Sequence, residues 1–367
     1  MTLKGVIMPA PGATNADGRP DAALLRVGNR PIVCHVLEAV RRAGAREVAL
    51  IVSARELAPT RACVTAEGPA DVEVELLAHA RRPGSLQDAL ARAVELVGED
   101  PCVVHAADGL LAQPLQPFAE RLREDAADLM LLAHRPAGAG GSASLASRRL
   151  LRLAGVAPHD CTAELAGVCL FGAGALARVA HVGLCRGEEL DLTGAAGHLT
   201  RAGGRLRVEH VRGWHRYGGT AADLLELNRL VLEALMRGAG AAADGLAQRL
   251  ADGRRGGEDD GSRIEGCVEL HPSACVQSSV IVGPAIVGAG ALVQDSYIGP
   301  YTSIGAGARI EGAEIERSII LPRASIVHIG GRLVGSIVGE DARVFRDFSL
   351  PKALRLNVGD GGEVALC

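Results

Sequence analysis

KGVIMPAPGATN, at residues 4–15, is the stretch from which the fold is predicted. Val6, Ile7 and Met8 predict a short buried strand, and the small and turn-forming residues that follow them predict a loop. α/β proteins commonly bind phosphate groups where a first strand leads into a glycine-containing loop, because backbone N–H groups can approach the ligand closely there. Such a loop is a weak signal by itself, since it also occurs as an ordinary turn between a strand and a helix.

Outward from this loop, short apolar runs alternate with amphipathic segments. The alternation predicts an α/β fold with a mixed, mostly parallel sheet that is covered by helices on both faces. Ligands of such sheets bind at the carboxyl ends of the strands, and Gly12, Gly84 and Asp108 are expected at that edge. Strands are predicted at 48–52, 72–78, 102–107, 128–132 and 149–153, and helices at 31–43 and 86–97.

The character of the sequence changes after residue 263. Aliphatic residues recur with a spacing of six, and a smaller residue lies two positions before each of the first six of them. This period predicts a parallel β-helix, in which each coil has three short faces and buries a layer of aliphatic side chains against the next coil. The aliphatic positions are Val280, Ile286, Leu292, Ile298, Ile304, Ile310 and, after a shift in phase, Ile320, Ile326, Val338 and Val344.

The segment between these two patterns predicts a domain boundary. Residues 238–263 are rich in Gly, Ala, Asp and Arg and show little apolar periodicity, which is typical of a linker. We therefore predict an α/β domain at 1–237, a linker at 238–263 and a β-helix domain at 264–367.

Composition argues against several classes of function. The chain has 367 residues, a formal charge of −4 and 2% aromatic residues, so neither a basic nucleic-acid-binding surface nor base-stacking platforms are expected. The sequence lacks an apolar run of the length that a membrane span needs, so no membrane span is expected. The N-terminal residues enter a strand pattern at once, so no signal peptide is expected. Together these features predict a cytoplasmic protein. The nine cysteines lack CxxC spacing and are expected to be reduced thiols.

Several stretches of the chain resemble the motifs of sugar-1-phosphate nucleotidylyltransferases. Besides residues 4–15, they are VVHAAD at 103–108, AELAGVCLF at 163–171, GEELDLT at 187–193, GWHRYGG at 213–219 and DLLELNRLVLE at 223–233. A later stretch, SYIGPYTSIG at 296–305, resembles long-form glucose-1-phosphate thymidylyltransferases. The resemblance implies a Rossmann-like nucleotidylyltransferase domain followed by a left-handed β-helix of hexapeptide repeats.

The resemblance also implies an activity. Members of the family join a sugar 1-phosphate to the α-phosphate of a nucleoside triphosphate and release pyrophosphate. Mg²⁺ is the implied cofactor, a nucleoside triphosphate and a sugar-like phosphate are the implied partners, and a homo-oligomer is the implied assembly. Matched to the family motifs, the nucleotide-binding residues are Ala10, Gly12, Thr14, Asn15 and Gly84, the catalytic and metal-binding residue is Asp108, and the substrate-binding residues are Gly167 and Glu189.

The chain departs from the family pattern at charged positions. Asn15 stands in place of the arginine of the first loop, and Tyr217 stands in place of a second metal-binding aspartate. These changes predict an active site that is weakened or rebuilt. Arg19, Arg26 and Arg30 are candidates to reach a phosphate from the shortened segment that follows the loop.

Two other functions are compatible with the sequence. The fold is also suited to a non-catalytic protein that binds nucleotides or NDP-sugars or pairs with an active relative. A β-helix acyltransferase would need a histidine base, for which His271 and His328 are the candidates. Trp214 and His105 are expected to pack in the core.

Overall fold

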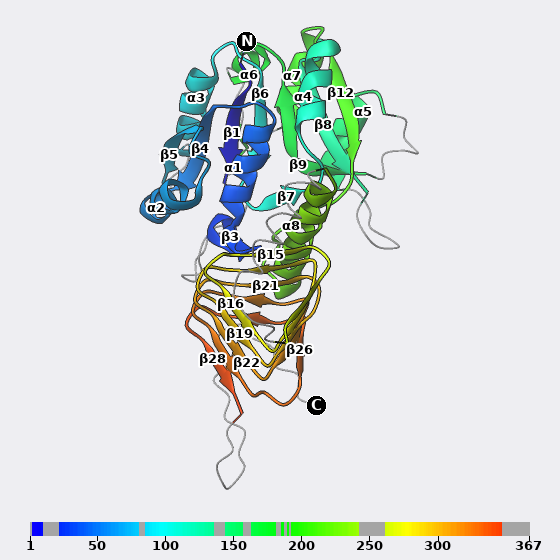
Figure 1. Ribbon diagram of the computed structural model, residues 1–367. Helices are drawn as coiled ribbons and strands as arrows, with labels where there is room; N and C mark the ends of the chain where they lie inside the picture. The colour runs from blue at the N-terminus through cyan, green and yellow to red at the C-terminus, as the bar shows by residue number, and fades with distance from the viewer. Residues whose placement is uncertain are drawn as a thin grey trace.

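The computed structural model of the chain describes residues 2–9, 22–80, 85–135, 144–156, 163–180, 185–186, 189–190, 192–241 and 261–346. An α/β unit forms the N-terminal part of the molecule, and a triangular stack of short strands forms the C-terminal part (Figure 1). Helix α8, Ala221–Ala241, runs from the α/β unit toward the first coils of the stack.

A seven-stranded sheet forms the centre of the α/β unit, in the order β12-β8-β9-β6-β1-β4-β5. Neighbouring strands are parallel except at β9, which is antiparallel to both β6 and β8. The predicted mixed, mostly parallel sheet is therefore confirmed. Its strands are β1 (Lys4–Met8), β4 (Glu47–Ser53), β5 (Glu73–His79), β6 (Cys102–Ala106), β8 (Leu129–His134), β9 (Glu164–Phe171) and β12 (Leu206–Val211).

Helices cover both faces of the sheet. One apolar core contains buried residues of α1 and α4, and a second contains buried residues of α3, α6 and α7. Because both faces are covered, the central strands are apolar along most of their length, which is why they could be predicted as short apolar runs. The helices are α1 (Ile32–Arg42), α2 (Leu57–Glu67), α3 (Ser85–Val97), α4 (Gln116–Glu124), α5 (Leu145–Leu153), α6 (Ala175–Ala180) and α7 (Leu192–Arg201).

The strand predicted at 149–153 is wrong, because these residues form the second half of helix α5. Leu150 and Leu151 are both buried, and such a short apolar run does not distinguish a strand from a buried helix. The helix begins after Ser144, whose Oγ accepts a hydrogen bond from the backbone N of Ser147 at 3.1 Å. A serine in this position is a typical N-cap and marks where the helix starts.

Replacing this cap should destabilise the protein modestly. We expect Ser144→Ala to lower the free energy of unfolding by about 1 kcal/mol, because the N–H of Ser147 loses its acceptor. Urea unfolding followed by circular dichroism measures the change. Ser144→Thr keeps the hydroxyl and should retain most of the stability, so equal losses in both variants would contradict the capping role.

Smaller elements complete the α/β unit. A short 3₁₀ helix, Ala22–Leu24, precedes a two-stranded hairpin, and two further two-stranded pairs lie elsewhere in the unit. All three pairs are antiparallel. They are β2 (Arg26–Val27) with β3 (Arg30–Pro31), β7 (Gly109–Leu111) with β13 (Trp214–Arg216), and β10 (Cys185–Arg186) with β11 (Glu189–Leu190).

The C-terminal part is a left-handed β-helix, as predicted. Its short strands form three parallel sheets of five strands each, one for every side of the triangle (Figure 1). Aliphatic side chains from successive coils stack inside it as one apolar core. The sheets are β14 (Arg263–Glu265), β17 (Val280–Val282), β20 (Tyr297–Ile298), β23 (Glu314–Glu316) and β26 (Arg332–Val334); β15 (Val268–Leu270), β18 (Ala285–Val287), β21 (Thr302–Ile304), β24 (Ile319–Ile320) and β27 (Ile337–Val338); and β16 (Cys275–Gln277), β19 (Leu292–Gln294), β22 (Arg309–Glu311), β25 (Ser325–Val327) and β28 (Arg343–Phe345).

The predicted inward positions of the second coil, which contains β17, β18 and β19, are wrong by one residue. Ile281, Val287 and Val293 belong to the β-helix core, whereas Val280, Ile286 and Leu292 do not. From Ile298 onward the predicted positions are correct. The error arises because the coils differ in length, whereas the prediction assumed a constant spacing. Equivalent serines of neighbouring coils, which are hydrogen-bonded to one another, show the difference. Ser279 and Ser296 are 17 residues apart, and Ser318 and Ser336 are 18 residues apart.

One buried asparagine joins the two parts of the molecule. Asn228 of α8 accepts hydrogen bonds at Oδ1 from the Gly28 backbone N at 2.8 Å and from Ser303 Oγ at 2.9 Å. Its Nδ2 donates to the carbonyl oxygen of Tyr301 at 3.1 Å. The neighbouring residue of the β2–β3 hairpin, Asn29, donates through Nδ2 to the carbonyl oxygen of Ile304. The hairpin, α8 and the β-helix are therefore fixed against one another.

The hairpin reaches this junction through a glycine that its geometry requires. Gly28 has a φ of +52°, a conformation that disfavours other residues. A Cβ at this position would also lie 2.4 Å from Val231 Cγ1 in α8. Helix α8 extends to Ala241, and the first strand of the β-helix begins at Arg263.

Candidate active site

Asp108 follows the last residues of β6, at the carboxyl edge of the sheet. The backbone N of Ala107 donates to the carbonyl oxygen of Met8, so the chain remains beside the end of β1 as it approaches Asp108. Only 1% of Asp108 is exposed to solvent. The structure therefore places this carboxylate next to the carboxyl end of β1, at the edge of the sheet where the sequence predicted it.

Arg216 binds the Asp108 carboxylate. Its Nε donates to Asp108 Oδ2 at 2.5 Å, in a charge-assisted hydrogen bond. The backbone fixes this contact, because Arg216 pairs with Gly109 in the β7–β13 ribbon and the N of Tyr217 donates to the carbonyl oxygen of Asp108. The Arg216 side chain is 38% exposed, so it links the buried carboxylate to the surface.

Trp214 and two glycines form the surface beside this ion pair. A Cβ on Gly109 would lie 2.3 Å from Trp214 Cη2, and a Cβ on Gly167 would lie 2.8 Å from Trp214 Cζ2. The indole therefore packs directly against both glycine backbones. Its edge contacts His105, with ring centroids 5.8 Å apart. Burial lowers the pKa of His105 to about 4, and its Nδ1 lies 2.7 Å from the carbonyl oxygen of Ala106, as expected of a neutral core histidine.

Gly167 packs against the same ring of Trp214 as Gly109 does. It is exposed, and it belongs to the part of β9 where the pairing with β8 shifts register between Leu131 and Ala133. A Cβ on Gly167 would lie 2.9 Å from the Cβ of Ala106, two residues before Asp108. Where the regular hydrogen bonding between two strands is interrupted in this way, backbone groups can bind a ligand instead. The predicted substrate-binding role of Gly167 is consistent with this position.

The start of α8 borders the same region. Asp223 accepts hydrogen bonds from the backbone N atoms of Gly218 and Thr220, and its Oδ1 lies 3.2 Å from His215 Nε2. Burial acts to raise the pKa of Asp223, but hydrogen bonds from Thr220 and Gly218 outweigh it and hold that pKa below its usual range. These contacts give the segment between β13 and α8 a defined conformation.

All five predicted nucleotide-binding residues lie outside the described part of the chain. The backbone of Glu189 belongs to β11, but its side chain is also outside that part. Asp108 and Gly167 are the predicted site residues that the structure brings together. The five nucleotide-binding residues outside the described segments are Ala10, Gly12, Thr14, Asn15 and Gly84.

Two of the arginines proposed to reach a phosphate bind α2 instead. Arg26 makes a bidentate ion pair with the Glu67 carboxylate, at 2.9 Å for both bonds. Arg30 donates through Nη2 to the carbonyl oxygen of Glu67. The interpretation of Arg26 and Arg30 as replacements for the missing loop arginine is therefore wrong, and Arg19 lies outside the described residues.

The donor set around Asp108 does not fit a magnesium ion. Mg²⁺ prefers carboxylate and water oxygens, and here the buried carboxylate already binds a guanidinium. Tyr217 stands at the position of the second family aspartate. Among the described residues, no group of three or more His, Cys, Asp or Glu side chains is arranged to hold a metal ion.

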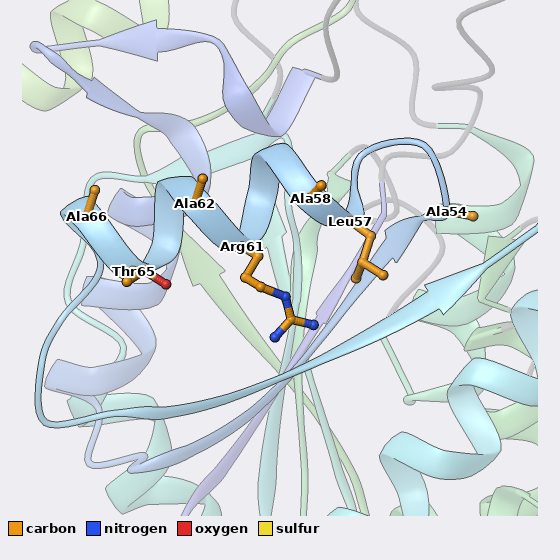
Figure 2. Close-up of a pocket in the computed structure, with 7 residues that line it drawn as sticks. All are labelled: Ala54, Leu57, Ala58, Arg61, Ala62, Thr65 and Ala66. Atoms are coloured by element: carbon orange, nitrogen blue, oxygen red, sulfur yellow. The ribbon is translucent and has the colours of Figure 1, made fainter.

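A separate hollow lies along the outer side of α2 (Figure 2). Alanines make up most of its lining, and Leu57 and Arg61 point out from the helix beside it. Its other lining residues are Ala54, Ala58, Ala62, Thr65 and Ala66, so none of the residues around Asp108 takes part.

In the described segments, none of the helices is long and apolar enough to cross a membrane.

Comparison with known proteins supports the resemblance over nearly the whole chain. The chain is 30% identical over 348 residues to glucose-1-phosphate thymidylyltransferase of Streptomyces antibioticus, which covers 94% of this chain and 93% of the relative. It is 29% identical over 342 residues to the Streptomyces griseus enzyme of the same name, covering 92% and 91% of the two chains. The low-salt glycan biosynthesis nucleotidyltransferase Agl11 of Haloferax volcanii is 26% identical over 376 residues, covering 99% and 100%.

Structural comparison supports the fold. A Bacillus anthracis protein assigned as a glucose-1-phosphate thymidylyltransferase and solved with sucrose matches with a TM-score of 0.50 and 16% identity, over 62% of this chain and 94% of that protein. No protein-family profile matches the chain. The sequence similarity to the Streptomyces antibioticus enzyme, together with an α/β sheet that carries Asp108 at its carboxyl edge, shows that this chain belongs to the sugar-1-phosphate nucleotidylyltransferase family.

Proposed function

We propose that the chain transfers a nucleotidyl group from a nucleoside triphosphate to a sugar 1-phosphate or a similar sugar-like phosphate. An oxygen of the sugar phosphate attacks the α-phosphorus, the bond from that phosphorus to the bridging oxygen breaks, and pyrophosphate leaves. The products are an NDP-sugar and pyrophosphate. The observation that carries this proposal is the buried Asp108 at the end of β6, beside the end of β1, in a chain of this family.

The chemistry needs little covalent help from the protein. Two anionic substrates must be held in line, and the negative charge that develops on the phosphate oxygens must be neutralised. In this proposal the exposed backbone at Gly167 binds the sugar beside the Trp214 ring, with Glu189 as a second sugar contact. The nucleotide is assigned to the loop after β1 and to the segment before α3, through Ala10, Gly12, Thr14, Asn15 and Gly84.

A pyrophosphate-release assay tests the activity. Purified full-length chain is incubated with each common nucleoside triphosphate and a panel of hexose 1-phosphates, with and without MgCl₂. We expect pyrophosphate release with at least one pair of nucleoside triphosphate and sugar phosphate, and none when the sugar phosphate is omitted.

A homo-oligomer and a cytoplasmic location are part of this proposal. Size-exclusion chromatography with light scattering measures the oligomeric state.

A non-catalytic binder is the second candidate, and the Asp108–Arg216 pair is the observation that favours it. The pair neutralises a carboxylate that would bind the metal according to the family resemblance. This candidate predicts that NDP-sugars raise the melting temperature while no substrate pair releases pyrophosphate. Release by the wild-type chain would contradict it, and the absence of both release and ligand binding would contradict both candidates.

A further inference from the structure

Two cysteines from different helices lie in contact in the α/β unit. Cys34 belongs to the first turn of α1 and Cys63 to the second half of α2, and their Sγ atoms are 3.6 Å apart. Cys34 is fully buried in the apolar core, whereas Cys63 is partly buried and packs against that core from its edge. The pair therefore has one protected member and one partly accessible member.

The two sulfurs are close enough to form a disulfide after a small movement. A disulfide bond is about 2.0 Å long, so the Sγ atoms would have to approach each other by roughly 1.6 Å. Helix α2 is suited to supply this movement, because Thr60 is its single buried residue and the rest of the helix is partly or fully exposed. Oxidation of the pair would therefore draw α2 toward α1.

The surroundings of Cys63 favour its thiolate. The hydrogen bond with Cys34 is the largest influence and lowers the pKa of the Cys63 thiol, against the effect of burial. Glu67 acts to raise that pKa, and Arg26 and Arg30 act to lower it. The hydrogen bond with Cys63 and burial both raise the pKa of the Cys34 thiol, so Cys63 is the member that ionises first. Partly exposed thiols beside basic groups are typical of reactive cysteines.

We propose that Cys34 and Cys63 are a redox-active pair, which an oxidant of the peroxide class converts into a reversible disulfide between α1 and α2. With hydrogen peroxide, the Cys63 thiolate attacks one oxygen, the O–O bond breaks, and hydroxide leaves and takes up a proton, so that Cys63 becomes a sulfenic acid. The Cys34 sulfur then attacks the Cys63 sulfur, the S–O bond breaks, and a second water leaves with the Cys34 proton. Two thiols and one peroxide thus give one disulfide and two water molecules.

The disulfide would act on contacts that lead from α2 to the β-helix. Glu67 lies one turn after Cys63 and binds both Arg26 and Arg30 of the β2–β3 hairpin. Asn29 of the same hairpin donates a hydrogen bond to the β-helix. A cross-link that fixes α2 to α1 therefore stiffens this series of contacts. Disulfides of reducing compartments are usually transient and redox-sensing, which suits the cytoplasmic location proposed for the chain.

Disulfide mapping of the full-length chain tests the proposal. The reduced protein is treated with a small excess of hydrogen peroxide, remaining thiols are alkylated, and tryptic peptides are analysed by mass spectrometry without reduction. We expect peptides 27–41 and 62–81 to be linked in most molecules and to separate after dithiothreitol is added. Cys102 and Cys169 are an internal control, because burial raises the pKa of both thiols and both should stay reduced.

Single variants identify the sulfur that is oxidised first. In Cys34→Ala the sulfenic acid of Cys63 has no partner, so dimedone should trap it. In Cys63→Ala, dimedone should trap Cys34 at least about tenfold more slowly, because a buried thiol with a raised pKa is mostly protonated. Equal trapping rates would overturn the assigned roles. Cys275→Ser, which changes an exposed cysteine of the β-helix, is the matched control and should leave the linked fraction unchanged.

Hydrogen exchange and thermal melting measure the effect on α2. In the oxidised chain the α2 amides should exchange at least about tenfold more slowly than in the reduced chain, while those of α5 change by less than about twofold. The melting temperature should rise by about 5 °C, because the cross-link closes a loop of about 30 residues. Melting under reducing conditions also shows that each variant is folded.

Recovery of Cys34 and Cys63 as alkylated thiols after peroxide treatment would overturn the inference. Links from Cys63 to a cysteine other than Cys34 would overturn it as well. A linked pair that leaves the α2 amides unchanged would overturn the effect on α2. The inference does not depend on the proposed function, because neither cysteine is among the residues assigned to nucleotidyl transfer.

Discussion

Asn228→Ala is expected to lower the free energy of unfolding by about 4 kcal/mol, because each buried partner that loses its hydrogen bond costs about 1–3 kcal/mol. Asn228 is 1% exposed and binds the Gly28 N, Ser303 Oγ and the carbonyl oxygen of Tyr301. The substitution leaves the Gly28 N and Ser303 Oγ buried without this partner, and the Tyr301 carbonyl oxygen partly buried without it. Urea unfolding measures the loss, with far-UV circular dichroism for the whole chain and fluorescence of Trp214, the single tryptophan, for the α/β unit.

Met236→Ala is the control for this prediction. Met236 lies on the same helix and is 48% exposed, so its truncation should change the free energy of unfolding by less than about 0.5 kcal/mol. Equal changes in the two variants would show that the hydrogen bonds of Asn228 do not join the two parts of the molecule.

Gly109→Ala should destabilise the protein by about 2 kcal/mol, a typical cost of forcing an extra group into a packed region. The new Cβ would lie 2.3 Å from Trp214 Cη2, so the indole must move. We also expect a shift of the Trp214 emission maximum and weaker binding of dTTP, because Gly109 adjoins Asp108 and pairs with Arg216. Fluorescence, urea unfolding and calorimetry measure the three effects.

Gly331→Ala is the matched control, since no atom lies within 4 Å of the position that its Cβ would occupy. It should leave the emission maximum and ligand affinity unchanged. If Gly109→Ala also left the emission maximum unchanged, the close packing of Trp214 against this glycine would be disproved.

The sequence was sufficient to predict the sheet because its strands are covered on both faces. The apolar runs at 48–52 and 102–107 correspond to β4 and β6, within one residue at each end. The same reasoning failed for α5, where Leu150 and Leu151 resemble a strand but the cap at Ser144 starts a helix. Helices α2 and α4 were not predicted. α2 has a single buried residue, Thr60, and therefore little apolar periodicity to detect.

The ion pair of the candidate site could not be predicted from sequence. Asp108 and Arg216 are 108 residues apart, and only the antiparallel pairing of β7 with β13 brings them together. A signal was nevertheless present, because Arg216 lies within GWHRYGG, one residue before Tyr217. An arginine that appears next to a lost aspartate indicates that the charge of a site has changed. The inward positions of the β-helix failed at Val280 because the coil there is shorter than a constant spacing of six assumes, and the run of aliphatic residues at 280–282 gives no sign of the shift.

The junction at Asn228 limits how this protein can be recombined with its relatives. Three separate segments meet there, namely the β2–β3 hairpin, α8 and the coil that contains Ser303. A chimera that exchanges only the C-terminal coils would place foreign carbonyl and hydroxyl groups opposite this asparagine. We therefore expect functional chimeras only when the hairpin and the long helix are transplanted together with the coils, as one inherited unit.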